Sequence, residues 1–391
     1  MFQVIGYVTN AHAAMLLRIL CFISLATLSA VPAELPASER IAARDYPSVF
    51  QAWNGAKPLP GQSEADMLAR HDLAFVHPSQ LGLRSEEPFE GTAFKFTAAS
   101  VAAAREHRTK LLAKNPHMVL LAEVRYRDAP KGFIPENAPW WKRDGAGAFI
   151  MGWAEGGYRL LDVAQEDWQS QVVHRAKAVM DTGVFDGVML DWWNDDASRV
   201  SLIRRVREAI GGDALILVNA NDREIPQTAE YVNGLFMECY RSATPEDWSR
   251  ISDTLRWAET HLRSPRINCV ETWFHQSRND FVLMRSVTTL ALTQSDGCCL
   301  FSDPNDLPTA DHLHDWYAFW DKGLGLPLKP GVKRVDGAWE RGFTNGVVIY
   351  NPPGGVPVNV QLASPQRSRA TGRVGTEFTI PSGDGDIFIR K

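Results

Sequence analysis

Short apolar runs alternate with amphipathic segments through most of the chain. Apolar runs of about four to eight residues predict buried strands, and a period near 3.6 predicts helices. The clearest run, Val188-Met189-Leu190, lies within residues 184–193 and ends at Asp191. The pattern predicts strands at 72–77, 118–126, 148–153, 184–193, 214–221, 234–240, 267–274 and 297–303. It predicts helices at 96–112, 166–181, 201–210, 245–263, 280–293 and 311–322.

Strands that alternate with helices or loops in this way are typical of an α/β (β/α)₈ TIM barrel. A doubly wound open sheet is the alternative, but no glycine-rich phosphate loop follows any predicted strand. Beyond residue 328 apolar residues recur at every second position between Gly and Pro turns. We therefore expect a lead-in segment at 34–65, the barrel at 66–328, and a small antiparallel, β-sandwich-like domain at 329–391.

The N-terminal region predicts export. An apolar stretch covers residues 16–30, and small residues follow it up to Ala33. This pattern predicts a secretory signal peptide at 1–33, with Met1 or Met15 as its start and an uncleaved anchor helix as the alternative. The mature protein would then be secreted or periplasmic, without stable membrane insertion. Its cysteines lie in or beside predicted strands, so we expect buried thiols rather than disulfides: Cys239, Cys269, Cys298 and Cys299.

Composition narrows the class of partner. The chain has 391 residues and a net charge of −5 with no basic stripe, which argues against a nucleic-acid partner. Thirteen tryptophans fit a carbohydrate-handling protein, although core packing explains any single one equally well. The only close histidine pair, His312 and His314, falls on a predicted helix, and neither H-E-x-x-H nor G-x-S-x-G occurs. We therefore expect no metal and no cofactor.

Two carboxylates are the candidate catalytic groups. Asp191 and Glu238 each follow directly on an apolar run, at the ends of the predicted fourth and sixth strands. Alternate barrel strands share a layer of inward side chains, so we expect these carboxyls about 5–9 Å apart, the range used in glycoside hydrolysis. We assign Asp191 the ionised role. Glu238 is assigned the general acid because apolar neighbours such as Phe236 raise a carboxyl pKa. The sequence leaves retention and inversion open.

Other residues near strand ends are candidates for substrate binding. The aromatic ones offer stacking faces for sugars, and the polar ones offer hydrogen bonds to hydroxyls. Each has a structural alternative in core packing, loop solubility or, for Asp162 and Asp303, helix capping. Glu271 is also a back-up acid in place of Glu238. The full set is Glu123, Trp153, Asp162, Trp192, Asn219, Asn221, Tyr240, Glu271, Trp273 and Asp303.

Two short segments resemble barrel glycosidases. Phe185-Asp-Gly-Val-Met-Leu-Asp191 is similar to a fourth-strand motif that ends in a catalytic Asp in many of them. The segment 233–238 resembles the sixth strand of endo-α-1,4-polygalactosaminidase-like proteins and related glycoside hydrolases of unknown specificity. This resemblance implies catalytic roles for Asp191 and Glu238. The α-amylase-like group fits less well, because its acid follows the fifth strand, where this chain has Asn219 and Asn221.

These observations favour a secreted glycoside hydrolase that cleaves a polysaccharide with the Asp191 and Glu238 pair, without a metal. The first alternative is a catalytically inactive carbohydrate-binding barrel, since a fold alone does not establish catalysis. The second is a metal-dependent hydrolase. The identity of the sugar, its anomer, endo or exo cleavage, and the oligomeric state stay open.

Overall fold

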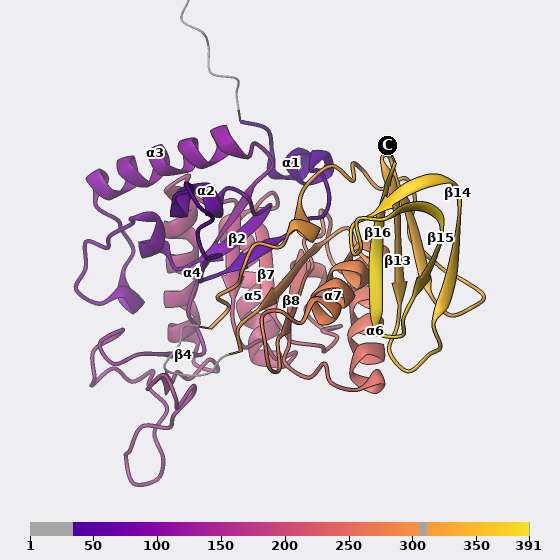
Figure 1. Cartoon of the computed structure of the whole chain (residues 1–391). Coiled ribbons are helices and arrows are strands. Elements are labelled where there is room, and N and C mark those ends of the chain that lie inside the picture. The colour runs from indigo at the N-terminus through magenta and orange to yellow at the C-terminus, as the bar shows by residue number, and fades with distance from the viewer. Residues whose placement is uncertain (1–33, 305–310, 391) are drawn as a thin grey trace, which may run out of the picture. The chain divides into compact units, whose positions relative to one another are not determined.

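The computed structural model describes residues 34–304 and 311–390, so the predicted signal peptide lies outside the described residues. Its central feature is an eight-stranded sheet in which all neighbouring strands are parallel (Figure 1). A parallel bridge between Val49 and Cys299 joins the first strand to the last. The sheet therefore closes into the predicted TIM barrel. In order around the barrel, its strands are β1 (Phe50–Ala52), β2 (Leu73–Val76), β3 (Val119–Glu123), β6 (Gly187–Leu190), β7 (Leu215–Asn219), β8 (Gly234–Cys239), β9 (Cys269–Trp273) and β10 (Cys298–Ser302).

One predicted strand is absent, and one barrel strand was not predicted. The predicted third strand at 148–153 lies in an excursion between β3 and α4, where Phe149 and Met151 form only isolated antiparallel bridges. The same excursion contains the two-stranded pair β4 (Asp128–Ala129) and β5 (Arg159–Leu160). The first barrel strand, β1, is instead in the segment 34–65, where a lead-in was expected. Because one strand is lost and one gained, β6 and β8 are still the fourth and sixth strands.

Most predicted helices are present, and their ends follow local sequence signals. Thr244 caps α6 by accepting a hydrogen bond from the Asp247 amide, and Pro245 takes the first helical position. The helix predicted at 311–322 is wrong, since the only helical turn there is the 3₁₀ segment η4 (Ala318–Trp320). The α-helices are α1 (Ala37–Ala43), α2 (Glu64–Leu68), α3 (Ala98–Lys114), α4 (Glu166–Asp181), α5 (Ala197–Ile210), α6 (Pro245–His261) and α7 (Phe281–Gln294). The other 3₁₀ segments are η1 (Pro78–Leu81), η2 (Glu90–Thr92) and η3 (Ala229–Tyr231).

Aromatic side chains fill the barrel. Phe50, Phe75 and Phe236 are fully buried, and their ring centroids lie 5.0 to 5.9 Å apart. Trp53 packs edge-on against Phe75 at 4.9 Å. The interior is therefore a packed core rather than a pore, and the cavity described below lies at the C-terminal ends of the strands. The four cysteines after residue 34 are free and buried, as predicted.

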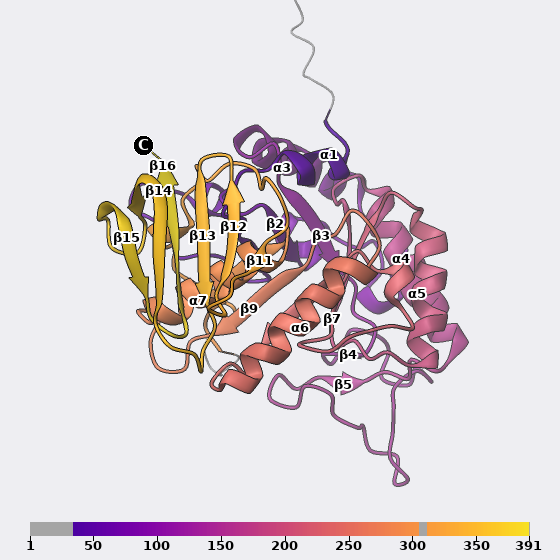
Figure 2. The same cartoon turned by 90° about the vertical axis from the view of Figure 1, so that its right-hand side faces the viewer.

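The C-terminal segment forms the expected second sheet, which is antiparallel and six-stranded (Figure 2). Along β14 buried and exposed residues alternate over 358–362, the period-two pattern visible in the sequence. Its strands, in spatial order, are β11 (Val332–Lys333), β12 (Trp339–Phe343), β13 (Gly346–Asn351), β16 (Asp384–Arg390), β14 (Val358–Ser368) and β15 (Val374–Ile380).

Helix α7 lies between the barrel and this sheet. Residues 286–294 are buried without a break, so the helix has no solvent-exposed face over this length. Arg285 makes two hydrogen bonds of 2.8 and 2.7 Å with Asp384 on β16. A side chain at Gly385 would clash with Thr289, because its Cβ would lie 1.9 Å from the hydroxyl oxygen. The sheet and the barrel therefore share one core through α7.

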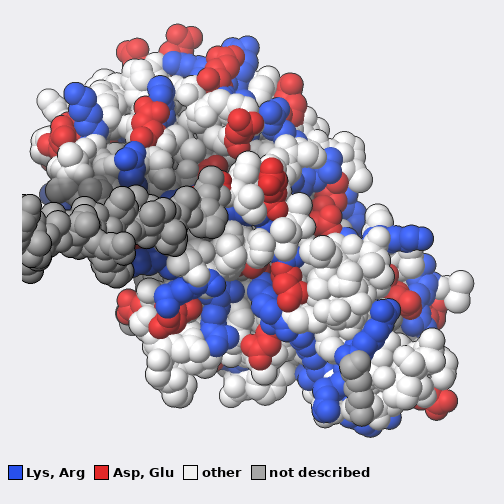
Figure 3. Space-filling model, turned by 90° about the horizontal axis from the view of Figure 1, so that it is seen from above, with Lys and Arg blue, Asp and Glu red and all other residues white. Residues whose placement is uncertain are grey.

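The surface seen in Figure 3 carries interleaved positive and negative side chains, in keeping with the small net charge. Within residues 34–304 and 311–390, no helix is long and apolar enough to cross a bilayer.

Candidate active site

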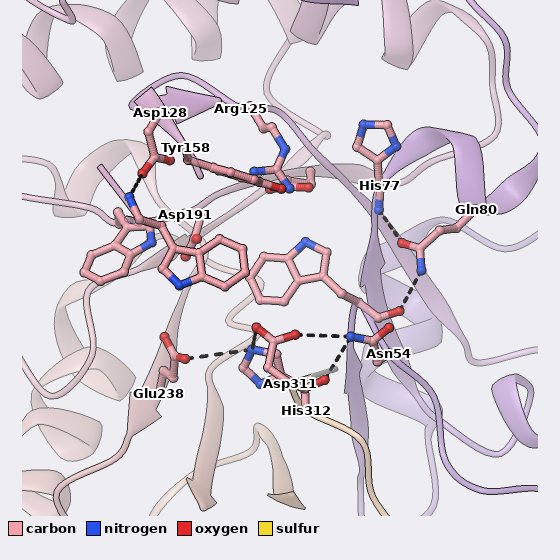
Figure 4. A pocket seen from close by; sticks show the side chains of 14 residues that line it. Asn54, His77, Gln80, Arg125, Asp128, Tyr158, Asp191, Glu238, Asp311 and His312 are labelled. Carbon is pink, nitrogen blue, oxygen red and sulfur yellow. Dashed lines mark hydrogen bonds and ion pairs between the residues drawn. The ribbon is translucent and has the colours of Figure 1, made fainter. Parts of the chain in front are cut away.

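A cavity of about 380 Å³ opens at the C-terminal ends of the barrel strands (Figure 4). This is the end of a TIM barrel where ligands bind. Five residues predicted from the sequence line it, namely both catalytic candidates together with Glu123, Trp153 and Trp192. The complete lining is Trp53, Asn54, His77, Gln80, Glu123, Arg125, Asp128, Trp153, Tyr158, Asp191, Trp192, Glu238, Asp311 and His312.

Close strand pairing places Asp191 at this end of the barrel. Gly187 begins β6 at a point where a Cβ would lie 2.0 Å from the Leu215 carbonyl oxygen. Glycine is therefore required for β6 to pair with β7. The next three residues of β6 are fully buried, and Asp191 is the first side chain beyond them to reach the cavity.

Asn219 holds the two catalytic candidates together. Its Nδ2 donates hydrogen bonds of 2.8 Å to Asp191 Oδ1 and of 2.8 Å to Glu238 Oε2. The two N–H bonds of an amide diverge by about 120°, so these oxygens lie roughly 5 Å apart. A separation of about 5–5.5 Å is typical of retaining glycosidases, whereas inverting enzymes need about 6.5–9.5 Å.

The two carboxyls differ in acidity. Burial raises the pKa of Asp191 to about 6, with the Glu123 carboxylate adding to the rise and Asn219 opposing it. Burial raises the pKa of Glu238 further, to about 8, with Asp191 and Glu271 adding to the rise and His312 opposing it. At neutral pH, Asp191 is therefore mostly ionised while Glu238 keeps its proton.

Glu271 lies behind the cavity rather than in it. Its side chain is fully buried and accepts hydrogen bonds from Ser302 and from His312 Nδ1, the latter at 2.8 and 3.0 Å. Although burial opposes the charge on His312, Glu271 raises the pKa of this imidazole to about 10. The back-up acid of the sequence analysis is therefore the counter-ion of a buried histidine.

Glu238, Glu271 and His312 are the one group among the described residues that could hold a metal ion. Glu238, Glu271 and His312 each offer one atom, and these atoms lie within 4.8 Å of one another. His312 Nδ1, however, already donates to both Glu271 oxygens. The donor set therefore fits an ion-paired chain better than a metal centre, which needs lone pairs facing one point.

A second acidic group lies beside Asp191. Glu123, at the end of β3, pairs through one oxygen with Arg125 at 3.2 Å. Its other oxygen, Oε2, is buried and has no hydrogen-bond partner among the described residues. Asp128 accepts hydrogen bonds from the Trp153 amide and from Arg127 Nη1, at 3.0 and 2.7 Å. Each of these two acids is thus paired with an arginine on this side of the cavity.

Aromatic faces surround the acids. Trp192 is 44% exposed, and the Arg127 guanidinium lies 4.6 Å from its ring centroid. Trp153 packs edge-on against Tyr158 at 5.0 Å. Tyr240 and Trp273 pack against each other at 5.9 Å and lie outside the lining of the cavity. Large flat rings at a polar cavity suit stacking against sugar rings.

Three of the predicted binding residues have structural roles. Asp162 accepts from the Gln165 side chain and lies 3.8 Å from Lys142 Nζ. Asp303 is buried and paired with Arg278. The Asn221 amide donates to the Glu238 carbonyl at 3.0 Å and so supports the backbone of the site. None of the three lines the cavity.

Strained backbone gathers around the site. Among the described residues, four that are not glycine have a positive φ: Trp53, Trp192, Asn221 and His312, at 46°, 54°, 53° and 58°. Trp53, Trp192 and Asn221 lie within two residues of the end of a barrel strand, and His312 lies further along the chain after β10. Such conformations persist only where the surrounding structure enforces them, and they cluster at functional sites.

Sequence reasoning missed nine of the fourteen lining residues. Trp53 and Asn54 follow the strand that was not predicted, while His77 and Gln80 lie at the end of the predicted first strand and just beyond it. Asp311 and His312 were assigned to a helix. His77 directly follows an apolar run, the same signal that identified Asp191, but the candidates at strand ends were limited to carboxylates, amides and aromatic residues.

Comparison with known proteins supports the architecture. The sequence matches no protein-family model and no curated protein. Among solved structures, an α-amylase from Malbranchea cinnamomea is 10% identical with a TM-score of 0.54, over 91% of this chain and 98% of that one. A maltogenic α-amylase from Thermotoga neapolitana is 9% identical with a TM-score of 0.52, over 88% and 99%. An α-amylase from Lactobacillus plantarum is 10% identical with a TM-score of 0.53, over 90% and 99%.

The likeness establishes the fold. It spans nearly the whole chain, so the pairing of a TIM barrel with a C-terminal β domain is shared with these glycoside hydrolases. The chemistry must be argued from the site itself, because one fold supports many activities.

Proposed function

We propose that this protein is a glycoside hydrolase that cleaves a polysaccharide with Asp191 as nucleophile and Glu238 as acid and base. The observation that carries the proposal is the Asn219 bridge, which holds the two carboxyls roughly 5 Å apart at the edge of an open cavity. That separation favours retention of the anomeric configuration. The pKa values of about 6 for Asp191 and about 8 for Glu238 support the division of roles.

The proposed reaction has two steps. Glu238 first gives its proton to the glycosidic oxygen while the Asp191 carboxylate attacks the anomeric carbon, so the leaving sugar departs as an alcohol and a glycosyl ester remains on Asp191. Ionised Glu238 then takes a proton from water, and the resulting hydroxyl group attacks the same carbon. The ester bond to Asp191 breaks, and both carboxyls return to their starting states.

The lining supports a sugar polymer as substrate. Trp53, Trp153 and Trp192 offer stacking faces on several sides of the cavity. Two buried polar atoms in this lining, Glu123 Oε2 and Trp53 Nε1, have no partner among the described residues and suit substrate hydroxyl or amino groups. An unpaired carboxylate oxygen favours an amino sugar, in keeping with the resemblance to endo-α-1,4-polygalactosaminidase-like proteins. Export after removal of residues 1–33 is part of the same proposal.

A panel assay tests the proposal. Purified protein is incubated with neutral, amino-sugar and acidic polysaccharides, and reducing ends are counted. Asp191→Asn and Glu238→Gln should each lose at least about a thousandfold in kcat on the substrate that wild type cleaves. Asp162→Asn is the matched control, since Asp162 lies outside the cavity lining and should leave kcat unchanged.

The same assay distinguishes the alternatives. NMR of the first product should show the anomer of the substrate, because the reaction retains configuration. Inversion would contradict the nucleophilic role of Asp191. Binding of a polysaccharide without any turnover by wild type would instead support a catalytically inactive carbohydrate-binding barrel.

A further inference from the structure

His312 lies closest to the Glu238 carboxyl among the buried cations of the described site. It follows β10 and is 1% exposed, with a φ of 58°. Its ring packs between Trp53 at 5.1 Å and Phe236 at 5.9 Å. A left-handed backbone and two aromatic neighbours hold the imidazole in one orientation.

The two ring nitrogens face different groups. Nδ1 donates to Glu271, whose oxygens lie 2.8 and 3.0 Å away. Nε2 lies 3.8 Å from Glu238 Oε1 and 3.5 Å from Asp311 Oδ2 (Figure 4). Because Glu271 fixes the proton on Nδ1, any second proton sits on Nε2 and points toward these cavity carboxylates.

We propose that His312 is a positioning residue for Glu238: an imidazolium anchored by Glu271 that orients the Glu238 carboxyl and allows it to release its proton. The inference deepens the proposed function, on which its catalytic meaning rests. Asp311 is joined to the neighbouring loop by hydrogen bonds from Asn54 to its carbonyl and carboxylate oxygens, at 2.8 and 3.2 Å. Asn54, Asp311 and His312 thus form one series of polar side chains that ends at Glu238.

The charges around Glu238 explain why a cation is needed there. The titratable groups that act on it are Asp191, Glu271 and His312, two of them carboxylates, while Asp311 faces the His312 ring. Glu238 must hold a proton in the first step and lose it in the second, as a base toward water. Burial beside these two carboxylates alone would keep Glu238 protonated. A positive charge nearby favours the ionised form and brings both states within reach near neutral pH.

Wild-type protein provides the first test. NMR spectra of ¹⁵N-histidine-labelled protein report the protonation of each ring nitrogen. We expect both nitrogens of His312 to stay protonated past pH 8, while His314, two residues further on, stays neutral. Burial lowers the pKa of His314 to about 4, and its Nε2 faces His71 at 2.9 Å. A neutral His312 at pH 7 would overturn the proposal.

Variants provide the second test. His312→Asn removes the cation and keeps a residue type that tolerates positive φ. The Glu238 pKa, followed by ¹³C NMR of the carboxyl and assigned with Glu238→Gln, should rise by about 1–3 units. The pKa that defines the basic limb of the kcat/KM profile should rise by the same amount. His314→Asn, which removes a neutral buried imidazole from the same segment, should leave both unchanged. Where His312→Asn does not fold, Glu271→Gln should lower the His312 pKa by about 1–3 units.

These readouts separate the two proposals. An unchanged Glu238 pKa in folded His312→Asn overturns the positioning role even if wild type cleaves a glycan. Wild type without turnover on any glycan, together with the expected shift in the Glu238 pKa, overturns the proposed function while the electrostatic role of His312 stands.

Discussion

Replacing Asn219 with alanine removes the one side chain among the described residues that donates hydrogen bonds to both catalytic candidates. The change deletes a 3.1 Å hydrogen bond that Asn219 Oδ1 accepts from the Asn221 backbone N–H, together with two carboxylate hydrogen bonds of 2.8 Å, one to Asp191 and one to Glu238. Both bonds stabilise the ionised form of their carboxylate, so their loss should raise both pKa values. We therefore expect the whole pH–rate profile to move to higher pH.

The size of this shift follows from the bond to Asp191, the carboxyl that is ionised in the resting site. A hydrogen bond to a charged group contributes about 1.5–3 kcal/mol, and one pKa unit corresponds to about 1.4 kcal/mol. The Asp191 pKa should rise from about 6 by roughly one to two units. At pH 6 the fraction of enzyme with ionised Asp191, and with it kcat/KM, should fall roughly five- to fiftyfold.

The assay is kcat/KM across the bell-shaped profile, whose acidic limb reports Asp191 in the free enzyme. Asn221→Gly is the matched control. It removes a side-chain amide two residues away, where a φ of 53° suits glycine. Among the described residues this amide donates to the Glu238 backbone carbonyl and to neither catalytic carboxyl. An acidic limb in a folded Asn219→Ala protein that matched that of wild type would show that Asn219 does not set the acidity of Asp191.

Four further results are expected. The free energy of unfolding of Glu238→Gln in urea, relative to that of wild type, should be higher at about pH 9 than at pH 4. The raised pKa of Glu238 contributes stability to wild type that is complete below 4.5 and lost as the pH rises through about 8. Equal differences at both pH values would contradict this. Trp192→Ala should raise KM roughly tenfold with little change in kcat, since the half-exposed ring binds ground and transition states alike; a fall in kcat alone would argue against stacking. Asp186→Ala should cost about 3–5 kcal/mol in denaturant unfolding, because Arg40 and Arg108 would remain buried without their shared carboxylate; a loss below about 1 kcal/mol would show that the cluster relaxes. Dialysis against EDTA should leave turnover unchanged, whereas a loss restored by added metal would support a metal-dependent hydrolase.

The carboxylate pair could be predicted from sequence because its geometry depends on strand order alone. Asp191 and Glu238 each follow an unbroken apolar run, and strands two apart share a layer of the barrel. The strand between them, β7, ends in Asn219, which the bridge requires. The amide was visible as a candidate, but its two hydrogen bonds depend on side-chain geometry that periodicity does not encode.

The errors have a common physical origin in short or irregular segments. β1 has only three residues, too few for a periodic signal, and its place in the barrel depends on pairing with β2. The segment after residue 311 has apolar spacing that suits a helix. Instead, its aromatic residues are anchored separately: Trp320 donates to Thr288 on α7, and Tyr317 donates to the Arg278 carbonyl. Tertiary contacts thus override local propensity, and His312 reaches the cavity as a result.

The burial of α7 has a consequence for how this molecule can be divided. A helix that is buried on every side depends on its neighbours, because removal of residues 332–390 would expose the side facing β16 to water. The catalytic scaffold and the C-terminal sheet should therefore melt in one calorimetric transition, and neither should be exchangeable as a cassette between enzymes. Any rearrangement of the gene that separates them would have to redesign this one helix first.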